Sequence, residues 1–233
     1  MKKFSVLNTN IEIKHSNNLK IVKKTYKPNI DLGLTNKKIH QMLIKYIEDI
    51  KKSKINFPSV IDSEVIDNKI IFLCKYKGEN ILDLYSYNDF LLEKTNVLDL
   101  IISLIEKAIK CNLNIDPHPK NFVFENGIIY YVDFCPPLIP EYISTRVNLN
   151  KKDSKIVESN FNYFKPENLF YHLCGDFIDV YRKQNHEIII KTIFNKLIKR
   201  NFIQNIDFES FFEKCKKIRD LEDERLEKGV YLF

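Results

Sequence analysis

Residues 114–140 of the chain read NIDPHPKNFVFENGIIYYVDFCPPLIP, the stretch of the sequence with the densest structural signals. Glu125-Asn126-Gly127 separates two short apolar runs, which is the strongest local signal for a β-hairpin. Before it, the prolines at 117 and 119 exclude a regular helix and give the loop a fixed, irregular shape. We therefore expect Asp116 and Asn121 at the two ends of a stiff loop, with the hairpin returning Asp133 close to Asn121.

Two acids and an asparagine held in this way suit phosphoryl transfer from a nucleotide. That reaction needs positioning, a magnesium ion and a carboxylate beside the attacking hydroxyl. Asn121 and Asp133 supply hard oxygen ligands, which Mg²⁺ prefers. Asp116 is the predicted catalytic residue, which orients the acceptor hydroxyl and receives its proton. A single Asp beside a proline is more often a loop residue that binds backbone amides, so the prediction depends on the set of three.

The Asp-x-His-Pro-x-Asn loop, the hairpin and the Asp133-Phe134 pair resemble the catalytic core of the protein-kinase-like fold. The likeness is closest to its small-molecule branch, the aminoglycoside and choline phosphotransferases, which commonly carry a histidine where this chain has His118. The resemblance implies an ATP-dependent phosphotransferase acting on a hydroxyl of a small molecule. It implies ATP and Mg²⁺ as cofactors, with the metal on Asn121 and Asp133. His118 itself is expected to bridge the loop by hydrogen bonds and not to act chemically.

Upstream of the loop, the pattern predicts three strands, one helix and two more strands, with Asn8-Thr9-Asn10 as a turn. The strands are expected at Phe4–Leu7, Ile11–Ile13, Leu19–Tyr26, Glu64–Ile66 and Ile70–Cys74. The helix follows Thr35, a candidate N-cap. Its apolar face recurs at helical spacing at Ile39, Met42, Leu43, Tyr46, Ile47 and Ile50.

This order matches the small lobe of the kinase-like fold, and Tyr76 to Leu82 resembles the link that follows its hinge. We therefore expect an α+β, two-lobed fold with an N-terminal antiparallel sheet plus one helix and a mainly helical C-terminal lobe. Residues 1–75 form the expected N-terminal lobe, with five strands, and residues 76–233 the expected C-terminal lobe.

The second part of the chain reads mainly as helices. Thr95 or Asn96 can begin a helix whose predicted buried face is Val97, Leu98, Ile101, Leu104, Ile105, Ala108 and Ile109. Further helices are expected from about residue 161 to residue 225. Within them Asp176 permits two interpretations: it braces the catalytic loop, as a buried acid does in the kinase-like fold, or it is a plain helix N-cap.

The segment from Leu19 to Thr25 resembles the strand that holds the phosphate-binding lysine in this fold. Lys23 fits the family spacing from the strand start and is the predicted nucleotide-binding residue. Lys24 points to the opposite face of the same strand. The usual acid partner of that lysine is harder to find. On the helix after Thr35, Glu48 falls opposite the apolar face and Asp49 on its flank.

Two departures from the family keep other functions open. The chain has no Gly-rich phosphate loop, and Cys135 stands where protein kinases usually carry glycine after the Asp-Phe pair. A kinase-like pseudoenzyme or regulatory binding module is therefore the first alternative. A protein kinase, or a kinase of a lipid-linked glycan, built on the same core is a further one.

Composition narrows the class of protein. The formal net charge is +6, but the 32 lysines are scattered among acids and there are only 5 arginines, so a specific nucleic-acid partner is not expected. No apolar run approaches the length of a membrane span, and no apolar stretch follows the basic residues at the start. The five cysteines lie far apart and are expected to be reduced thiols. We expect a cytoplasmic protein.

Overall fold

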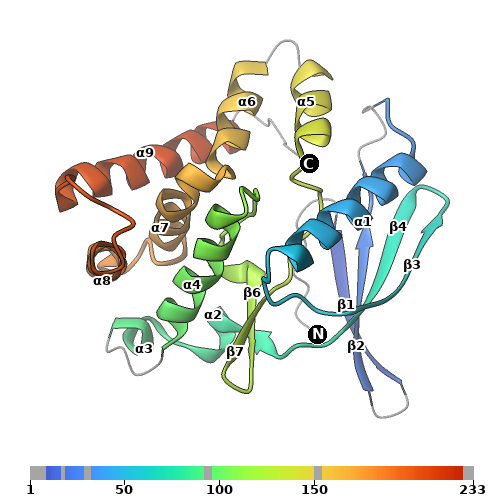
Figure 1. The fold of residues 1–233 in the computed structure, drawn as a ribbon, viewed down its shortest axis with the longest axis horizontal. Coiled ribbons are helices and arrows are strands. Elements are labelled where there is room, and N and C mark those ends of the chain that lie inside the picture. The colour runs from blue at the N-terminus through green and yellow to red at the C-terminus, as the bar shows by residue number, and fades with distance from the viewer. Residues whose placement is uncertain (1–8, 17–18, 29–32, 92–95, 150–153, 228–233) are drawn as a thin grey trace.

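The computed structural model describes residues 9–16, 19–28, 33–91, 96–149 and 154–227. Within them the chain is α+β, with an antiparallel sheet in the N-terminal part and mostly helices in the C-terminal part (Figure 1). The N-terminal elements are β1 (Thr9–Ser16), β2 (Leu19–Tyr26), α1 (Asn36–Lys52), β3 (Val60–Ile66) and β4 (Lys69–Lys75). The middle elements are β5 (Glu79–Asn80), α2 (Ile81–Leu84), α3 (Tyr87–Leu91), α4 (Val97–Lys110), η2 (Pro119–Asn121), β6 (Phe122–Glu125) and β7 (Ile128–Tyr131). The last are α5 (Pro140–Leu149), α6 (Ser154–Tyr163), η3 (Pro166–Asn168), α7 (Leu169–Val180), α8 (His186–Lys199) and α9 (Phe208–Glu227).

The first sheet has the strand order β1-β2-β4-β3, and each neighbouring pair is antiparallel. The predicted strand Leu19–Tyr26 is confirmed as β2, whereas the predicted strand Phe4–Leu7 lies outside the described residues. The predicted turn at residues 8–10 needs correction, because Thr9 and Asn10 pair with Tyr26 and Thr25 at the start of β1. The described part of the sheet therefore has four strands.

Helix α1 lies beside this sheet, and its sequence signals are confirmed. Thr35 is the N-cap, and its Oγ1 accepts a hydrogen bond from the Lys38 amide at 3.2 Å. The buried residues are the six that the helical spacing predicts: Ile39, Met42, Leu43, Tyr46, Ile47 and Ile50. This apolar face packs with the buried Ile70 and Phe72 of β4 in the common core.

The hairpin β6–β7 is also confirmed. Asn126 and Gly127 have φ values of 51° and 80°, the left-handed pair that a tight two-residue hairpin turn requires. With β5 the hairpin forms a second sheet, in the order β5-β6-β7. Gly78 leads into β5 with φ +93°, and a Cβ there would lie 2.0 Å from the Phe124 carbonyl oxygen. The link between the two sheets therefore requires glycine at this position.

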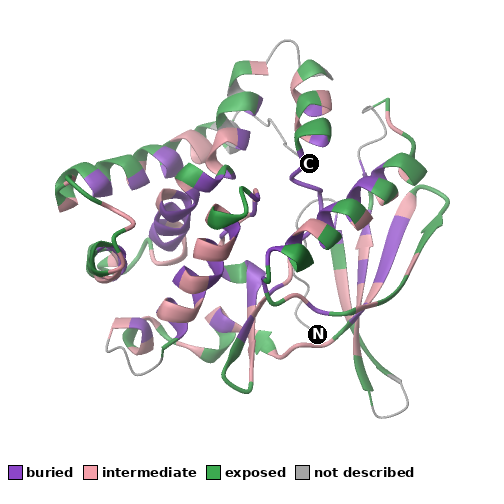
Figure 2. Cartoon of the chain, in the orientation of Figure 1, coloured by how far each residue is buried: buried purple, intermediate pink, exposed green. Residues whose placement is uncertain are grey.

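The helical part is organised around α7. Figure 2 shows α7 as the most continuously buried helix, and α9 packs along it. In α4 the predicted face is buried except for Ile109, which is partly exposed, and Ile102 joins it. All five cysteines are free thiols, as expected. In the described part of the chain, no helix combines the length and the apolarity needed to cross a membrane.

Candidate active site

The proline-containing loop before the hairpin is shaped by its own side chains. The His118 amide donates a hydrogen bond to Asp116 Oδ1 at 3.0 Å, and His118 Nδ1 accepts one from the Lys120 amide at 3.1 Å. His118 thereby caps the short turn η2, which begins at Pro119. Burial keeps the pKa of His118 well below its ordinary value, so the imidazole is neutral and Nδ1 can accept. The geometry agrees with the expected bridging role of His118.

Asn121 joins the two ends of the predicted site. Its buried side chain donates from Nδ2 to the Asp116 carbonyl oxygen at 3.2 Å. Its main-chain oxygen accepts from the Val132 amide at 2.9 Å, beside Asp133. Within the described residues no hydrogen bond reaches Asn121 Oδ1 or Asp133 Oδ2. The structure thus brings Asp116, Asn121 and Asp133 together and leaves one oxygen of each metal-ligand candidate without a protein donor.

The lysine that lies beside Asp133 is Lys24, and the predicted Lys23 does not join this group. Lys24 Nζ lies 2.7 Å from Asp133 Oδ1, and the lysine side chain is only 6% exposed. The ammonium group also lies over the Phe134 ring, 4.4 Å from its centre. Burial, the largest single influence, lowers the pKa of Lys24, but the Asp133 carboxylate together with neighbouring Cys135 and Cys74 raises it more, so the net pKa is raised. Lys24 is therefore a charged amine held beside Asp133.

Lys23 lies on the other face of β2 because successive side chains in a strand alternate. Its cross-strand neighbours are Glu12 in β1 and Leu73 in β4, and it is only partly buried. Lys24 is opposite Phe72, whose ring packs edge-on against Phe134 with centres 4.9 Å apart. The face of β2 that carries Lys24 is thus the face that the segment after β7 covers.

No acid of α1, a helix described over its full length, contacts Lys24. Glu48 is exposed, and the carboxylate of Asp49 lies 3.7 Å from Lys52 Nζ. The helical spacing in the sequence places neither acid in the centre of the buried face of α1, and neither is among its buried residues. Asp133 is the acid that pairs with the lysine, at a separation of 109 residues in the chain.

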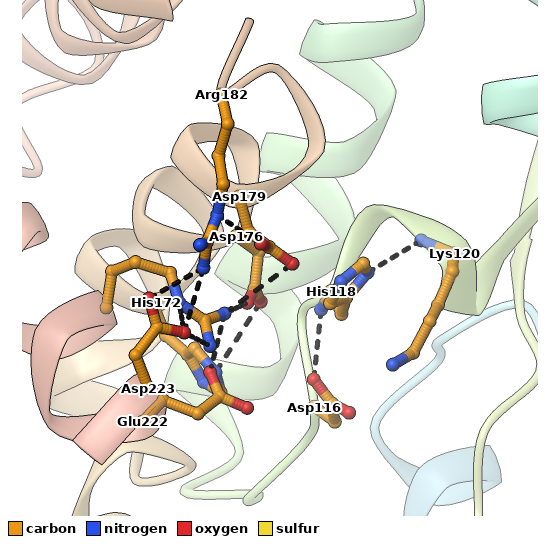
Figure 3. A network of polar contacts seen from close by, with 10 residues as sticks. Asp116, His118, Lys120, His172, Asp176, Asp179, Arg182, Glu222 and Asp223 are labelled. Carbon is orange, nitrogen blue, oxygen red and sulfur yellow. Dashed lines mark hydrogen bonds and ion pairs between the residues drawn. The ribbon is translucent and has the colours of Figure 1, made fainter. Parts of the chain in front are cut away.

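Behind the loop lies a group of titratable side chains, of which the sequence indicated only Asp116 and Asp176. Asp116, His172 and Asp176 each offer a potential ligand atom, and these atoms all lie within 4.8 Å of one another. Figure 3 shows Asp116 and His118 from the loop facing His172 and Asp176 from α7. Asp176 is 1% exposed and lies inside α7, so the N-cap interpretation is wrong. Burial raises the pKa of Asp116 and raises that of Asp176 well above its ordinary value.

The positive charge in this group comes from Arg219 of α9. Its guanidinium lies 3.7 Å from Asp176 Oδ1, 3.0 Å from Glu222 and 2.7 Å from Asp223. His172 Nε2 lies 3.5 Å from Asp176 Oδ2, and burial lowers the pKa of His172. A guanidinium in contact with Asp176 favours an ion-pair network over a metal site. His172 and Asp176 are four residues apart, so they lie on one face of α7. This spacing is the sequence signal that could have indicated that the two side chains belong to one group.

Replacing Arg219 with methionine is expected to lower the free energy of unfolding by about 3 kcal/mol, because acids on α7 and α9 would lose their buried cation. Arg182→Met is the matched control. Arg182 also pairs with Asp223, at 2.6 Å, but its side chain is 53% exposed. Its loss should cost less than about 1 kcal/mol. Urea unfolding of both variants measures the difference, and equal effects would show that burial of Arg219 contributes nothing.

No family model matches the chain, and no curated protein matches it either. What the chain itself provides is the loop, the hairpin and the lysine of β2, brought to one place from three parts of the sequence.

Proposed function

We propose that the chain is an ATP-dependent phosphotransferase of the protein-kinase-like fold that acts on a hydroxyl group of a small molecule. The observation that carries the proposal is the buried ion pair between Lys24 and Asp133, 2.7 Å long, beside Asn121 and Asp116. Three of these residues, Asp116, Asn121 and Asp133, are the ones that the spacing and chemistry of the sequence predict for such a site. A lysine of β2 lies beside the same group. Its positive charge supports an anionic substrate such as a nucleoside triphosphate.

In this proposal Asn121 and Asp133 hold Mg²⁺, and the oxygen atoms that lack a protein donor suit that ion. When bound, Mg²⁺ neutralises charge on the phosphates and helps to orient them. Lys24 has three N–H donors. It already donates to Asp133 and approaches the Val132 carbonyl oxygen at 3.5 Å. Its remaining donor capacity would bind phosphate oxygens next to the ion.

Asp116 is the proposed catalytic residue. The acceptor oxygen forms a bond to the γ-phosphorus of ATP, the bond from that phosphorus to the bridging oxygen of ADP breaks, and the hydroxyl proton passes to Asp116. Asp116 Oδ1 is fixed by the His118 amide, which orients the carboxylate before the acceptor binds. We place the acceptor against the helical part, propose a cytoplasmic location and expect no nucleic-acid partner.

A kinase-like binding module without transfer activity is the second candidate. The pairing of Lys24 favours it. Asp133 is already bound to Lys24, and α1 brings no second acid to that lysine that could replace Asp133. A site in this arrangement can bind a nucleotide while the lysine and the metal-binding acid restrain each other. Protein kinase activity, or transfer to a lipid-linked glycan, would use the same residues.

The first experiment is a thermal-shift titration with ATP, with and without Mg²⁺, on wild type and Asp133→Asn. Ligand at about 100 times its dissociation constant adds roughly 2.7 kcal/mol, which moves the melting temperature by a few degrees. We expect a Mg²⁺-dependent shift in wild type that the variant loses, measured against each protein's own unliganded melting temperature. Absence of a shift in wild type would exclude both candidates.

Product formation then separates the two candidates. Wild type is incubated with Mg²⁺ and radiolabelled ATP, with a panel of small hydroxyl acceptors and with no acceptor. Phosphorylated small molecule, absent with Asp116→Ala, supports the phosphotransferase. Nucleotide binding that survives in Asp116→Ala, with no product from any acceptor, supports the binding module, and labelled protein alone supports protein phosphorylation.

A further inference from the structure

Two buried tyrosines connect α1 to the loop that carries Asp116. Tyr46 lies on the buried face of α1, and its hydroxyl donates to the Asn114 carbonyl oxygen at 2.7 Å. Tyr131 ends β7, and its hydroxyl oxygen accepts from the Asp116 amide at 3.1 Å. The two side chains are 0% and 1% exposed, so water cannot replace these bonds. Both ends of the short segment 114–116 are thus held by phenol groups from other elements.

The two phenols bind the main chain of this segment in opposite senses. The Tyr46 hydroxyl donates its proton to the Asn114 carbonyl oxygen, and the Tyr131 oxygen accepts from the Asp116 amide two residues further along. Burial raises the pKa of both tyrosines well above the ordinary value, so both remain protonated phenols. Tyr46, the segment 114–116 and Tyr131 thus form one run, in which a hydrogen bond at each end holds the main chain between two buried phenols.

We propose that Tyr46 and Tyr131 are positioning residues that set the main chain of Asp116, and hence its carboxylate, relative to α1. The inference rests on the proposed function and extends it. A carboxylate on the main chain follows any movement of that main chain, and small displacements in an active site slow transfer strongly. Because α1 gives no acid to Lys24, the hydrogen bond from Tyr46 to Asn114 is the polar connection from α1 to the site among the described residues.

The chain offers a matched control pair. Tyr26 of β2 and Tyr142 of α5 are also buried, and their hydroxyl oxygens lie 3.1 Å apart. Tyr26→Phe removes a buried phenol hydroxyl from the same sheet and contacts neither Asn114 nor Asp116. It therefore reproduces the chemical change without touching the loop.

The test compares Tyr46→Phe, Tyr131→Phe, the double variant and Tyr26→Phe. We expect kcat to fall about five- to tenfold in each single variant of the run, the rate equivalent of one buried hydrogen bond. The KM for ATP should change by less than about twofold, because in the proposal the phosphates are bound by Lys24 and the metal, and neither tyrosine contacts these groups. The double variant should lose no more than the larger single loss, since either change breaks the same run. Tyr26→Phe should leave kcat unchanged.

A second readout does not need activity. The exchange rate of the Asp116 amide hydrogen, followed by NMR, should rise in Tyr131→Phe and also in Tyr46→Phe, which has no direct contact with that amide. If wild type has no turnover, the proposed function fails, and the amide exchange still decides the positioning role. Any of four results would overturn the inference. These are an unchanged kcat, additive losses in the double variant, an equal loss in Tyr26→Phe, or an unchanged exchange rate of the Asp116 amide in Tyr46→Phe.

Discussion

Replacing Lys24 with methionine is expected to lower the rate of phosphoryl transfer by about 10²- to 10³-fold, the loss seen when one charge-stabilising donor is removed. Methionine keeps much of the volume of the lysine stem, so packing against the Phe134 ring is largely preserved. What is lost is the ammonium group 2.7 Å from Asp133. Steady-state kinetics with saturating Mg²⁺-ATP measures the effect.

Lys23→Met is the control, because it makes the same substitution on the opposite face of β2. Lys23 is the adjacent residue of β2, but its side chain lies on the other face, across from Glu12 and Leu73. We expect its rate to stay within about twofold of wild type, as for a surface substitution. If the two variants lose activity equally, the assignment of Lys24 to the phosphate is wrong. If only Lys23→Met loses activity, the nucleotide lies on the opposite face of the sheet.

Asp116→Asn is expected to reduce kcat by about 10²- to 10⁴-fold and to leave Mg²⁺-ATP binding intact. Asparagine can still accept from the His118 amide through its side-chain oxygen, so the loop keeps its internal hydrogen bond. It cannot take the proton of the acceptor hydroxyl, and general-base catalysis contributes about this factor. The rate is measured with the acceptor that the panel identifies, and binding by the thermal shift.

Asp62→Asn is a matched control for this change. Asp62 is exposed on β3 and accepts from the Ser63 amide at 2.8 Å, so it makes the same kind of bond far from the loop. Its kcat should equal that of wild type. A kcat in Asp116→Asn within about threefold of wild type would be too small a loss for a general base, and Asp116 would then be a structural residue of the loop.

The local parts of the fold could be predicted from the sequence because local physics decides them. The six buried positions of α1, its Thr35 cap and the Asn126-Gly127 turn follow from spacing and backbone preference within a few residues. The loop at 116–121 was recognisable for the same reason, since prolines and a capping histidine shape it without outside help. That loop supplied Asp116 and Asn121, and the hairpin supplied the position of Asp133.

The choice between Lys23 and Lys24 could not be made locally. Strand alternation shows that the two side chains point in opposite directions, but not which face will be covered. The covering residue, Phe134, comes from a distant segment that packs on Phe72. Arg219 was missed for a similar reason, because it reaches Asp176 only after α9 packs on α7. The missing information in both cases is tertiary.

The ion pair between Lys24 and Asp133 also has a consequence for how the protein is assembled. Its members are 109 residues apart, one in the first sheet and one just after the second. A nearly buried ammonium group is unfavourable without its carboxylate, so the face of the first sheet that carries Lys24 is complete only with Asp133 in place. The first sheet and the hairpin therefore depend on each other to complete their cores. Separate expression of residues 1–75 and 76–233 would leave an unmatched charge at the exposed face of each fragment.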